Sequence, residues 1–330
     1  MNRYAIGDLS QSWVSQRNNN LIKSQINRLN AELSSGKAAD IPEHLGGDLA
    51  PLAALEADLS RTQSFISATQ TASNLASALQ ETLQQIQMES SDFSTQLLIA
   101  DGPLQQMALP LSQEASARLS DVSTLLNTRY AGQSLFAGAA TGQPAVADAS
   151  ITLSGLFAAL GGDTSPSNIR QEVDNWFSPG GGFDATGYLG SSTPASGHRL
   201  DDSTEISLRL TAHAPAFRQM LSGLALAALT EHASAADRGQ LLKDAGEILI
   251  QAEAMLGDDR ATLGFAEQRL AAHQTALTAQ ADGYEMARAA LIGKDPFETA
   301  GALQQAQTQM ELLYTLTARM SSLTLVNFLR

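Results

Sequence analysis

The sequence predicts a mainly α-helical fold. Long helices from both chain termini form a bundle and coiled coil, and a small mixed α+β domain is inserted between them. Apolar residues near both ends recur at spacings of three and four, as in a coiled-coil seam. Between residues 132 and 198 this spacing stops, and about half of the 25 glycines fall there. Helical regions on both sides of such a segment indicate that the chain runs out along one bundle and returns along it.

A narrow apolar stripe marks the first predicted helix. Ile22, Ile26, Leu29 and Leu33 follow one another at spacings of four, three and four, which places all of them on one face of a helix. The flanking residues are polar, and a helix of this kind is marginal when it is isolated. We therefore expect this helix to become ordered by packing against other helices.

A break in the helical pattern follows at residues 35–47, where glycine and proline occur and extend a helix only at a cost. Asp48 can cap a second long helix, which tolerates Pro51 in its first turn. Asp101-Gly102-Pro103 is a turn signal, and helical spacing resumes over residues 111–126. These signals predict a helical hairpin.

The glycine-rich segment is expected to form a small domain of its own. Ser165 and Pro166 favour the start of a helix over residues 168–177, because serine is a good cap and proline is tolerated at the first helical position. Further along, apolar and polar residues alternate, which is typical of a strand. The alternating apolar residues are Ile206, Leu208 and Leu210.

Helical character returns after Pro215, first over residues 217–229 and then in an almost unbroken stretch over residues 235–292. A continuous helix of the second length would span roughly 87 Å at about 1.5 Å per residue. Gly293 can end it, and Asp295-Pro296-Phe297-Glu298 is a capping-box arrangement that begins the last helix. The seam of the last helix consists of Leu303, Ala306, Met310, Leu313, Thr317 and Met320.

These elements predict three parts. Residues 1–40 and 295–330 form a terminal coiled coil, residues 41–140 and 214–294 form a bundle of long helices, and residues 141–213 form the inserted outer domain. Because the terminal helices are marginal alone, we expect them to bury area against neighbouring subunits; a purely intramolecular core is the alternative. Subunit contacts are expected at Ile22, Ile26, Leu29, Leu33, Leu303, Met310, Leu313, Met320, Leu323, Leu325 and Phe328.

Composition and charge exclude several classes of protein. The formal net charge is −14 and no cluster of Lys and Arg stands out, so we expect no nucleic-acid partner. The longest apolar run, residues 224–229, is too short to cross a membrane, and the N-terminus lacks the layout of a cleaved signal peptide. No cysteine is present, which removes disulfides, thiolate nucleophiles and Cys-ligated metals. We therefore expect no membrane insertion and no dependence on a redox compartment.

The sequence shows no constellation for catalysis, a cofactor or a metal. The five histidines do not pair with other ligand-type residues at motif spacing, and no G-x-S-x-G motif occurs. Gly180-Gly181-Gly182 lacks the lysine of a phosphate-binding loop and is interpreted as a flexible turn. Trp176 and Phe177, with Phe183 and Tyr188 nearby, form a recognition patch or, as we favour, the small core of the inserted domain. We expect a non-enzymatic protein with no cofactor.

Four short segments, in order and at matching distances from the chain ends, resemble the flagellin superfamily. The first ends in Leu33-Ser34-Ser35-Gly36-Lys37, and the second ends in Leu135-Phe136-Ala137-Gly138. The others are Arg260-Ala261-Thr262-Leu263-Gly264 and the closing residues 322–329. After Lys37 the family commonly has two Asp before Pro, whereas this chain has Ala38-Ala39-Asp40-Ile41-Pro42. Within the superfamily the pattern is most similar to that of hook–filament junction proteins.

The resemblance implies a structural subunit that is exported unfolded by the flagellar type III apparatus, without signal cleavage, to the hook–filament junction outside the cell. The implied partners are hook-associated protein 1, flagellin, further copies of the same chain in a ring, and an export chaperone. The terminal helices would form an inner tube, the long helices a supporting layer, and the insert an outer domain.

Three alternatives remain open. A filament flagellin would share the fold and the export route but would polymerise with itself; the ending Asn327-Phe328-Leu329 and the Leu135-Phe136-Ala137-Gly138 turn favour the junction protein. A secreted enzyme with the glycine-rich insert as its catalytic domain would need an acid, base, nucleophile or metal set there. A type III translocator or adhesin would need a membrane-active segment, which the sequence does not show.

Overall fold

The computed structural model describes residues 4–100, 107–208 and 210–328, with the side chains of residues 4–9, 11, 12 and 320–328 left out of the description. The chain divides into two compact units. The first contains the described residues up to 63 and from 278 onward, and the second contains residues 64–277. None of the helices in the described part of the chain combines the length and the apolar character needed to cross a membrane.

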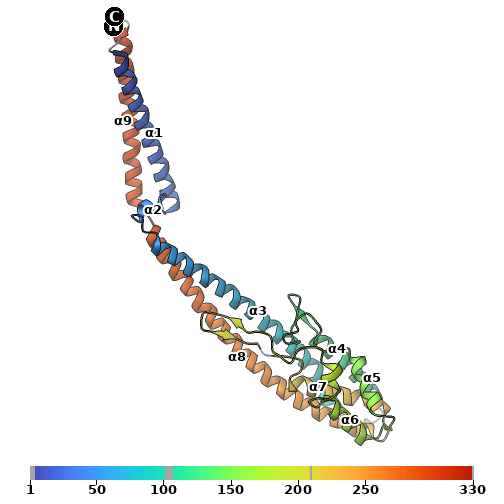
Figure 1. The fold of residues 1–330 in the computed structure, drawn as a ribbon. Coiled ribbons are helices and arrows are strands. Elements are labelled where there is room, and N and C mark those ends of the chain that lie inside the picture. Colours follow the sequence, from blue (N-terminus) through green and yellow to red (C-terminus); the bar gives the residue numbers. More distant parts are fainter. Residues whose placement is uncertain (1–3, 101–106, 209, 329–330) are drawn as a thin grey trace. The chain divides into compact units, whose positions relative to one another are not determined.

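The first unit is built around two long helices from opposite ends of the chain. Helices α1 (Tyr4–Ser35) and α9 (Pro296–Phe328) pack against each other (Figure 1). The short helix α2 (Ile41–His44) follows α1, and Asp40 caps it by accepting the backbone N–H of Glu43. Asp295 caps α9 in the same way, through the N–H of Phe297 at 2.7 Å. The predicted helix break and the predicted start of the last helix are confirmed.

Backbone hydrogen bonds join the segment after α1 to the segment before α9. Ala38 N–H donates to the carbonyl of Ile292 at 2.9 Å, and Lys294 N–H donates to the carbonyl of Gly36 at 3.1 Å. Gly36 has φ +67°, a left-handed conformation that suits glycine at the end of a helix. The chain is therefore tied to itself at the point where both terminal helices begin or end.

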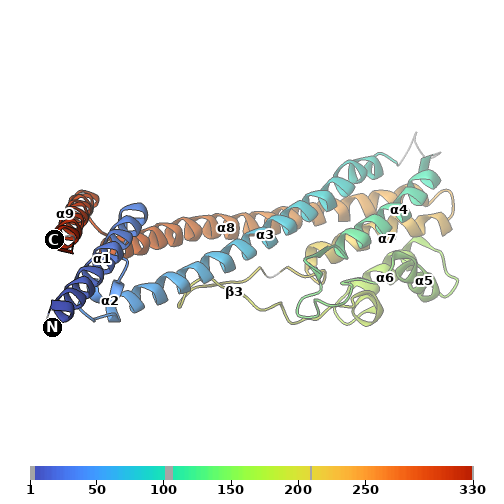
Figure 2. The ribbon, with the colours of Figure 1, turned by 90° about the horizontal axis from the view of Figure 1, so that it is seen from above.

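Four helices form the framework of the second unit (Figure 2). They are α3 (Ala50–Leu98), α4 (Ala108–Leu126), α7 (Pro215–Leu229) and α8 (Arg238–Ile292), of which α3 and α8 also extend into the first unit. Helix α7 packs on α4 and is buried on almost every side, which explains why its sequence is apolar all round. The confirmed fold class is a mainly α-helical bundle with a small mixed insert.

A leucine at every seventh position gives α8 a continuous buried edge. Within the second unit, α3 lies along this helix, and Gln80 Nε2 on α3 donates to the carbonyl of Arg260 on α8 at 3.1 Å. A repeat of seven keeps one face of a helix against its partner, as in a coiled coil. The leucines are Leu242, Leu249, Leu256, Leu263, Leu270 and Leu277, all of them buried.

The inserted region packs short elements onto α4 and α7. Helix α5 (Ala149–Ala159) and helix α6 (Pro166–Phe177) are its larger elements, and a π-helical turn, η2 (Phe183–Gly187), follows them. The described residues of the unit also form two small antiparallel pairs and a 3₁₀ turn. These are β1 (Arg129–Tyr130) with β2 (Gln133–Ser134), β3 (His198–Arg199) with β4 (Glu205–Ile206), and η3 (Thr230–His232).

Two local predictions differ from the structure. The strand predicted from Ile206, Leu208 and Leu210 is wrong beyond its first residue, because Leu210 N–H bonds locally to the carbonyl of Leu208 instead of a neighbouring strand. Helix α6 begins at Pro166 as predicted, but the Ser165 side chain makes no cap bond. The turn predicted at residues 101–103 lies outside the described residues, and the three-part division of the chain stays a prediction.

A charged cluster fixes the π-helical turn to α7. The buried Arg218 donates to the carbonyl of Phe177 at 3.0 Å and pairs with Asp184, and His213 Nε2 lies 3.0 Å from Asp184 Oδ1. Burial alone would raise the pKa of Asp184, but the N–H of Gly180 at 2.7 Å and the positive Arg218 outweigh it, so the pKa lies below its usual value. The carboxylate of Asp184 is thus the anchor of this part of the insert.

Asp184→Asn is expected to lower the free energy of unfolding by about 1–3 kcal/mol at pH 7, because it leaves Arg218 buried without its counter-charge. Asp184 has a lower pKa in the folded than in the unfolded state, so its stabilisation is full above the unfolded pKa and disappears as pH falls through the folded pKa. The difference between wild type and variant should shrink below about pH 4. Urea unfolding at pH 7 and pH 3 measures it, with the exposed Asp174→Asn on α6 as control. Equal losses in both variants would contradict this role.

Candidate subunit-contact site

The predicted contact residues fall into three groups in the structure. Packing of α1 and α9 buries Leu29 and Met310, which are 7% and 9% exposed. Leu33 is 39% exposed. The half-buried residues are Ile22, Ile26, Leu303 and Leu313. The side chains of Met320, Leu323, Leu325 and Phe328 lie outside the described residues.

The hairpin of α1 and α9 therefore uses part of the predicted seam within a single chain. Whether the same residues also contact other subunits stays a prediction. The hairpin leaves large apolar side chains exposed on both helices, and these are the side chains that a neighbouring subunit would meet. They are Trp13, Val14, Leu21 and Leu33 on α1, and Phe297, Leu312, Tyr314 and Leu316 on α9.

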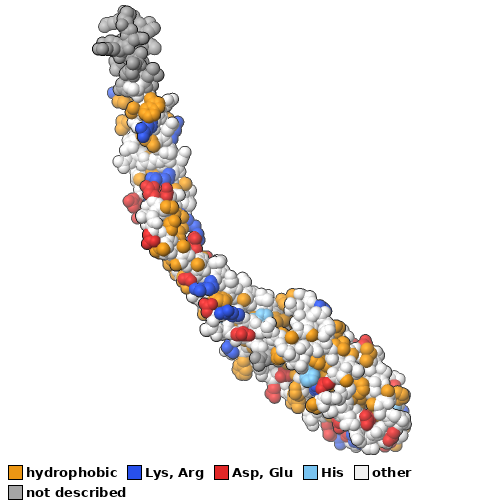
Figure 3. Space-filling model, viewed as in Figure 1, with side chains coloured by type: hydrophobic (Ala, Val, Ile, Leu, Met, Phe, Trp, Pro, Cys, Tyr) orange, Lys and Arg blue, Asp and Glu red, His pale blue; other side chains and the backbone are white. Residues whose placement is uncertain are grey.

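One exposed face of α1 combines aromatic, basic and aliphatic side chains. Trp13, Arg17 and Leu21 are spaced by four residues, so they lie along one side of the helix. Trp13 is 61% exposed and Leu21 is 57% exposed, and the Arg17 guanidinium lies 5.7 Å from the centre of the Trp13 ring. Figure 3 shows orange hydrophobic and blue basic side chains together on this part of the first unit. We call these three residues the Trp13 face.

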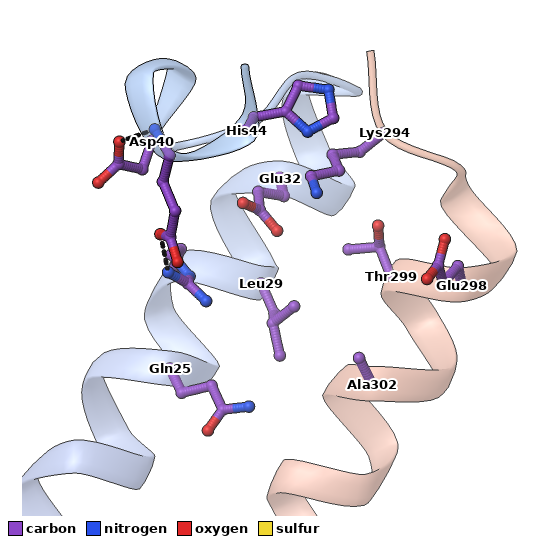
Figure 4. Close-up of a pocket in the computed structure, with 11 residues that line it drawn as sticks. Gln25, Leu29, Glu32, Asp40, His44, Lys294, Glu298, Thr299 and Ala302 are labelled. Carbon is purple, nitrogen blue, oxygen red and sulfur yellow. Dashed lines mark hydrogen bonds and ion pairs between the residues drawn. The ribbon is translucent and has the colours of Figure 1, made fainter. Parts of the chain in front are cut away.

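The base of the hairpin contains an open groove of about 440 Å³ between α1, α2 and α9. In Figure 4, Leu29 and Glu32 of α1 and Thr299 and Ala302 of α9 line the space between the two helices. Glu32 is 93% buried, since only 7% of it is exposed, and its Oε1 accepts the N–H of Ala39 at 3.1 Å. Groups of both charges surround it. They are Arg28, Asp40, Glu43, His44, Lys294 and Glu298.

The charges of this groove are not balanced. Arg28 pairs with Glu43 at 3.0 Å, and Asp40 caps α2. Among the described residues, the carboxylate of Glu298 has no cationic partner. Counting carboxylates, Arg and Lys alone, four carboxylates face two cations, Arg28 and Lys294, which gives the lining a formal charge of −2. We call this site the acidic groove.

Sequence reasoning from the seam missed the Trp13 face and the acidic groove. The seam pattern selects apolar residues at spacings of three and four, and it passes over an arginine between two apolar residues on a polar helix. The signal was nevertheless present, since Trp13 and Leu21 stand among asparagines and glutamines at helical spacing around Arg17. Aromatic residues and arginine on an otherwise polar surface are typical of interface hot spots.

The second unit contains a larger cavity of about 600 Å³ between α3 and the loops of the insert. Its walls carry leucines from α3 and hydroxyl and amide groups from the loops, and no carboxylate is among its lining residues. Among residues 4–100, 107–208 and 210–328, no three His, Asp or Glu side chains lie close enough together to hold a metal ion. The cavity thus offers a binding space whose lining includes His198 and hydroxyl groups but no carboxylate.

The glycine run at residues 180–182 serves packing. A Cβ on Gly181 would lie 2.2 Å from the carbonyl oxygen of Asn175, and one on Gly182 would lie 2.3 Å from the Trp176 ring. Phe177 and Phe183 are buried with their ring centres 5.4 Å apart. Phe177 and Phe183 are therefore core residues, as favoured, but the buried cluster to which they belong is continuous with α4 and α7, and Trp176 and Tyr188 are half-buried against it.

Comparison with known proteins finds a similarity to flagellins in the C-terminal part of the chain. Residues 247–329, which comprise most of α8 and α9, match the family model described as the bacterial flagellin C-terminal helical region. The fold is similar to that of a putative flagellar hook-associated protein from Vibrio parahaemolyticus, with a TM-score of 0.55 over 72% of this chain and 94% of that chain. The two sequences are 14% identical, so this likeness concerns the fold. No curated protein is significantly similar in sequence. Together these findings support the flagellin superfamily.

Proposed function

We propose that this chain is a structural subunit of the bacterial flagellum, and specifically the junction subunit, hook-associated protein 3, which lies between hook-associated protein 1 and the flagellin filament. The observation that carries the proposal is the pairing of α1 with α9, because the flagellin-like region includes α9 and its partner comes from the opposite end of the chain. The pairing leaves large apolar side chains exposed on both helices, as a subunit that assembles through its termini requires.

In this proposal the chain acts by geometry and by packing, without catalysis. The paired termini pack with those of other copies in a ring, and the insert faces outward. The chain is exported unfolded by the flagellar type III apparatus without signal cleavage, bound to a chaperone before export. A cysteine-free sequence suits such a route, since no disulfide has to form during refolding outside the cell.

A filament flagellin is the second candidate, because the matched family model is that of flagellin itself. The two candidates differ in self-assembly. A flagellin polymerises with itself without limit, whereas a junction subunit stops after it has covered the end of the hook.

Electron microscopy of isolated hooks tests the proposal. Hooks that carry hook-associated protein 1 are incubated with this chain and then with flagellin. We expect a cap of defined length after the first step and filament growth only on capped hooks after the second, with hooks lacking this chain as the control. Long filaments formed by this chain alone would make it a flagellin. Absence of the chain from hooks and from filaments would refute both candidates.

A further inference from the structure

The Trp13 face has the composition of a binding hot spot and no partner among the described residues of its own chain outside α1. Arg17 contacts the Trp13 ring, and no carboxylate of the described residues pairs with it. Between Asp8 and Glu32 the charged residues of the chain are Arg17, Lys23 and Arg28, all of them basic. This half of α1 is therefore positive in a chain whose net charge is −14.

The acidic groove has the complementary character. Glu32 is nearly buried; it accepts the backbone N–H of Ala39, and among the described residues no cation pairs with it. A buried carboxylate without a counter-charge is costly, so a cation that enters the groove gains a strong interaction. The half-buried Ala302 offers apolar surface beside the carboxylates of Glu32 and Glu298. The groove thus fits a side-chain set with one positive charge between apolar groups.

The Trp13 face cannot fill the groove of its own chain. Arg17 and Glu32 lie 15 positions apart on the same helix, which corresponds to about 22 Å at 1.5 Å per residue. A second copy that is displaced along the hairpin by about this distance brings its Arg17 to the level of Glu32. Both surfaces are then used once in every copy.

We propose that copies of this chain associate head to tail, with the Trp13 face of one copy seated in the acidic groove of the next, and Arg17 paired with Glu32 and Glu298. The inference rests on the proposed function, because it identifies a second copy as the partner of the terminal helices. A head-to-tail contact leaves one free face and one free groove at the ends, so it repeats until a ring closes or a filament forms. The contact is also salt-dependent, because its recognition is electrostatic.

Charge reversal tests the pairing in the full chain. Arg17→Glu and Glu298→Lys are each expected to weaken self-association in sedimentation experiments by at least about tenfold, the scale of a lost interfacial charge pair. The double variant, which restores opposite charges, should return to within about threefold of wild type. Arg269→Glu and Glu81→Lys make the same charge changes at exposed positions of the second unit and should have little effect. Trp13→Ala, at an exposed site that folding does not need, should weaken association as well.

Cross-linking tests the geometry of the contact. Because the sequence contains no cysteine, each introduced cysteine is the only one in its chain. Gln16→Cys adjoins the Trp13 face and Gln25→Cys lies at the groove. In the displaced arrangement the two positions are offset by about 9 Å along the helix axis, which is too far for a disulfide but within reach of a bismaleimide cross-linker. Treating a mixture of the two single-cysteine proteins with a bismaleimide should give a cross-linked dimer of the mixed pair in preference to either homodimer. A double reversal as weak as the single reversals, control variants equally weak, or no self-association of the wild type would overturn the contact. These experiments need no hooks, so a failure of the junction proposal and a failure of this contact are distinguishable.

Discussion

Deletion of residues 1–35 is expected to abolish assembly completely while the second unit stays folded. The deletion removes α1, and with it the partner of α9, the Trp13 face and one wall of the acidic groove. The large buried cluster of the protein runs from Ala72 to Leu270, and none of its members belongs to the deleted segment. The truncated chain should therefore retain one cooperative thermal transition, be monomeric in sedimentation, and show no density on hooks.

A shorter deletion of residues 1–12 serves as the matched control, because it keeps the Trp13 face and most of α1. We expect this variant to associate more strongly than the longer deletion does. Loss of cooperative unfolding in the chain that lacks residues 1–35 would show that α1 belongs to the folding core, and would contradict the separation between an assembling hairpin and an independently stable second unit.

Phe217→Ala is expected to lower the melting temperature of the second unit by about 10 °C. Phe217 on α7 is fully buried, and its ring meets that of Phe136 edge to face with 5.5 Å between the ring centres. Truncation of a buried phenylalanine to alanine costs about 3–5 kcal/mol through lost burial and the cavity left behind. For a unit of this size, each kcal/mol corresponds to about 2–4 °C. Differential scanning calorimetry measures the shift.

Phe265→Ala provides the comparison, because Phe265 is 68% exposed on α8, in the same unit. The same chemical change there should move the melting temperature by less than about 2 °C, since surface substitutions typically stay within 0.5 kcal/mol. Equal shifts for the two variants would indicate that the buried position of Phe217 does not determine stability. A small shift for both would point to a loosely packed α7.

The helical framework could be predicted from the sequence because local signals and packing agree there. Asp295 caps α9, whose start the sequence marks with Pro296, and Gly36 ends α1 in a left-handed conformation that other residues avoid. The prediction of a strand through Leu208 and Leu210 was wrong because an alternation of apolar and polar residues shows only which side chains share a face. It does not supply a neighbouring strand to bond with.

The contact site was harder to predict for a related reason. Spacing shows that Leu29 and Met310 lie on apolar faces, but it cannot tell whether the same chain or another one covers those faces. In the structure the hairpin itself buries both residues. The exposed Trp13 and the nearly buried Glu32 are distinguished only by packing between distant parts of the chain. The expectation of a flagellin-like chain came from resemblance.

The two backbone bonds near Gly36 and Ile292 bear on how the terminal helices can move. If the segments after α1 and before α9 were independent, each helix would swing about its own joint, and the two could splay apart. Because Ala38 is bonded to Ile292 and Lys294 to Gly36, the two joints are fused into a single pivot. A rotation of α1 about this point is therefore transmitted to α9, and the two helices move together.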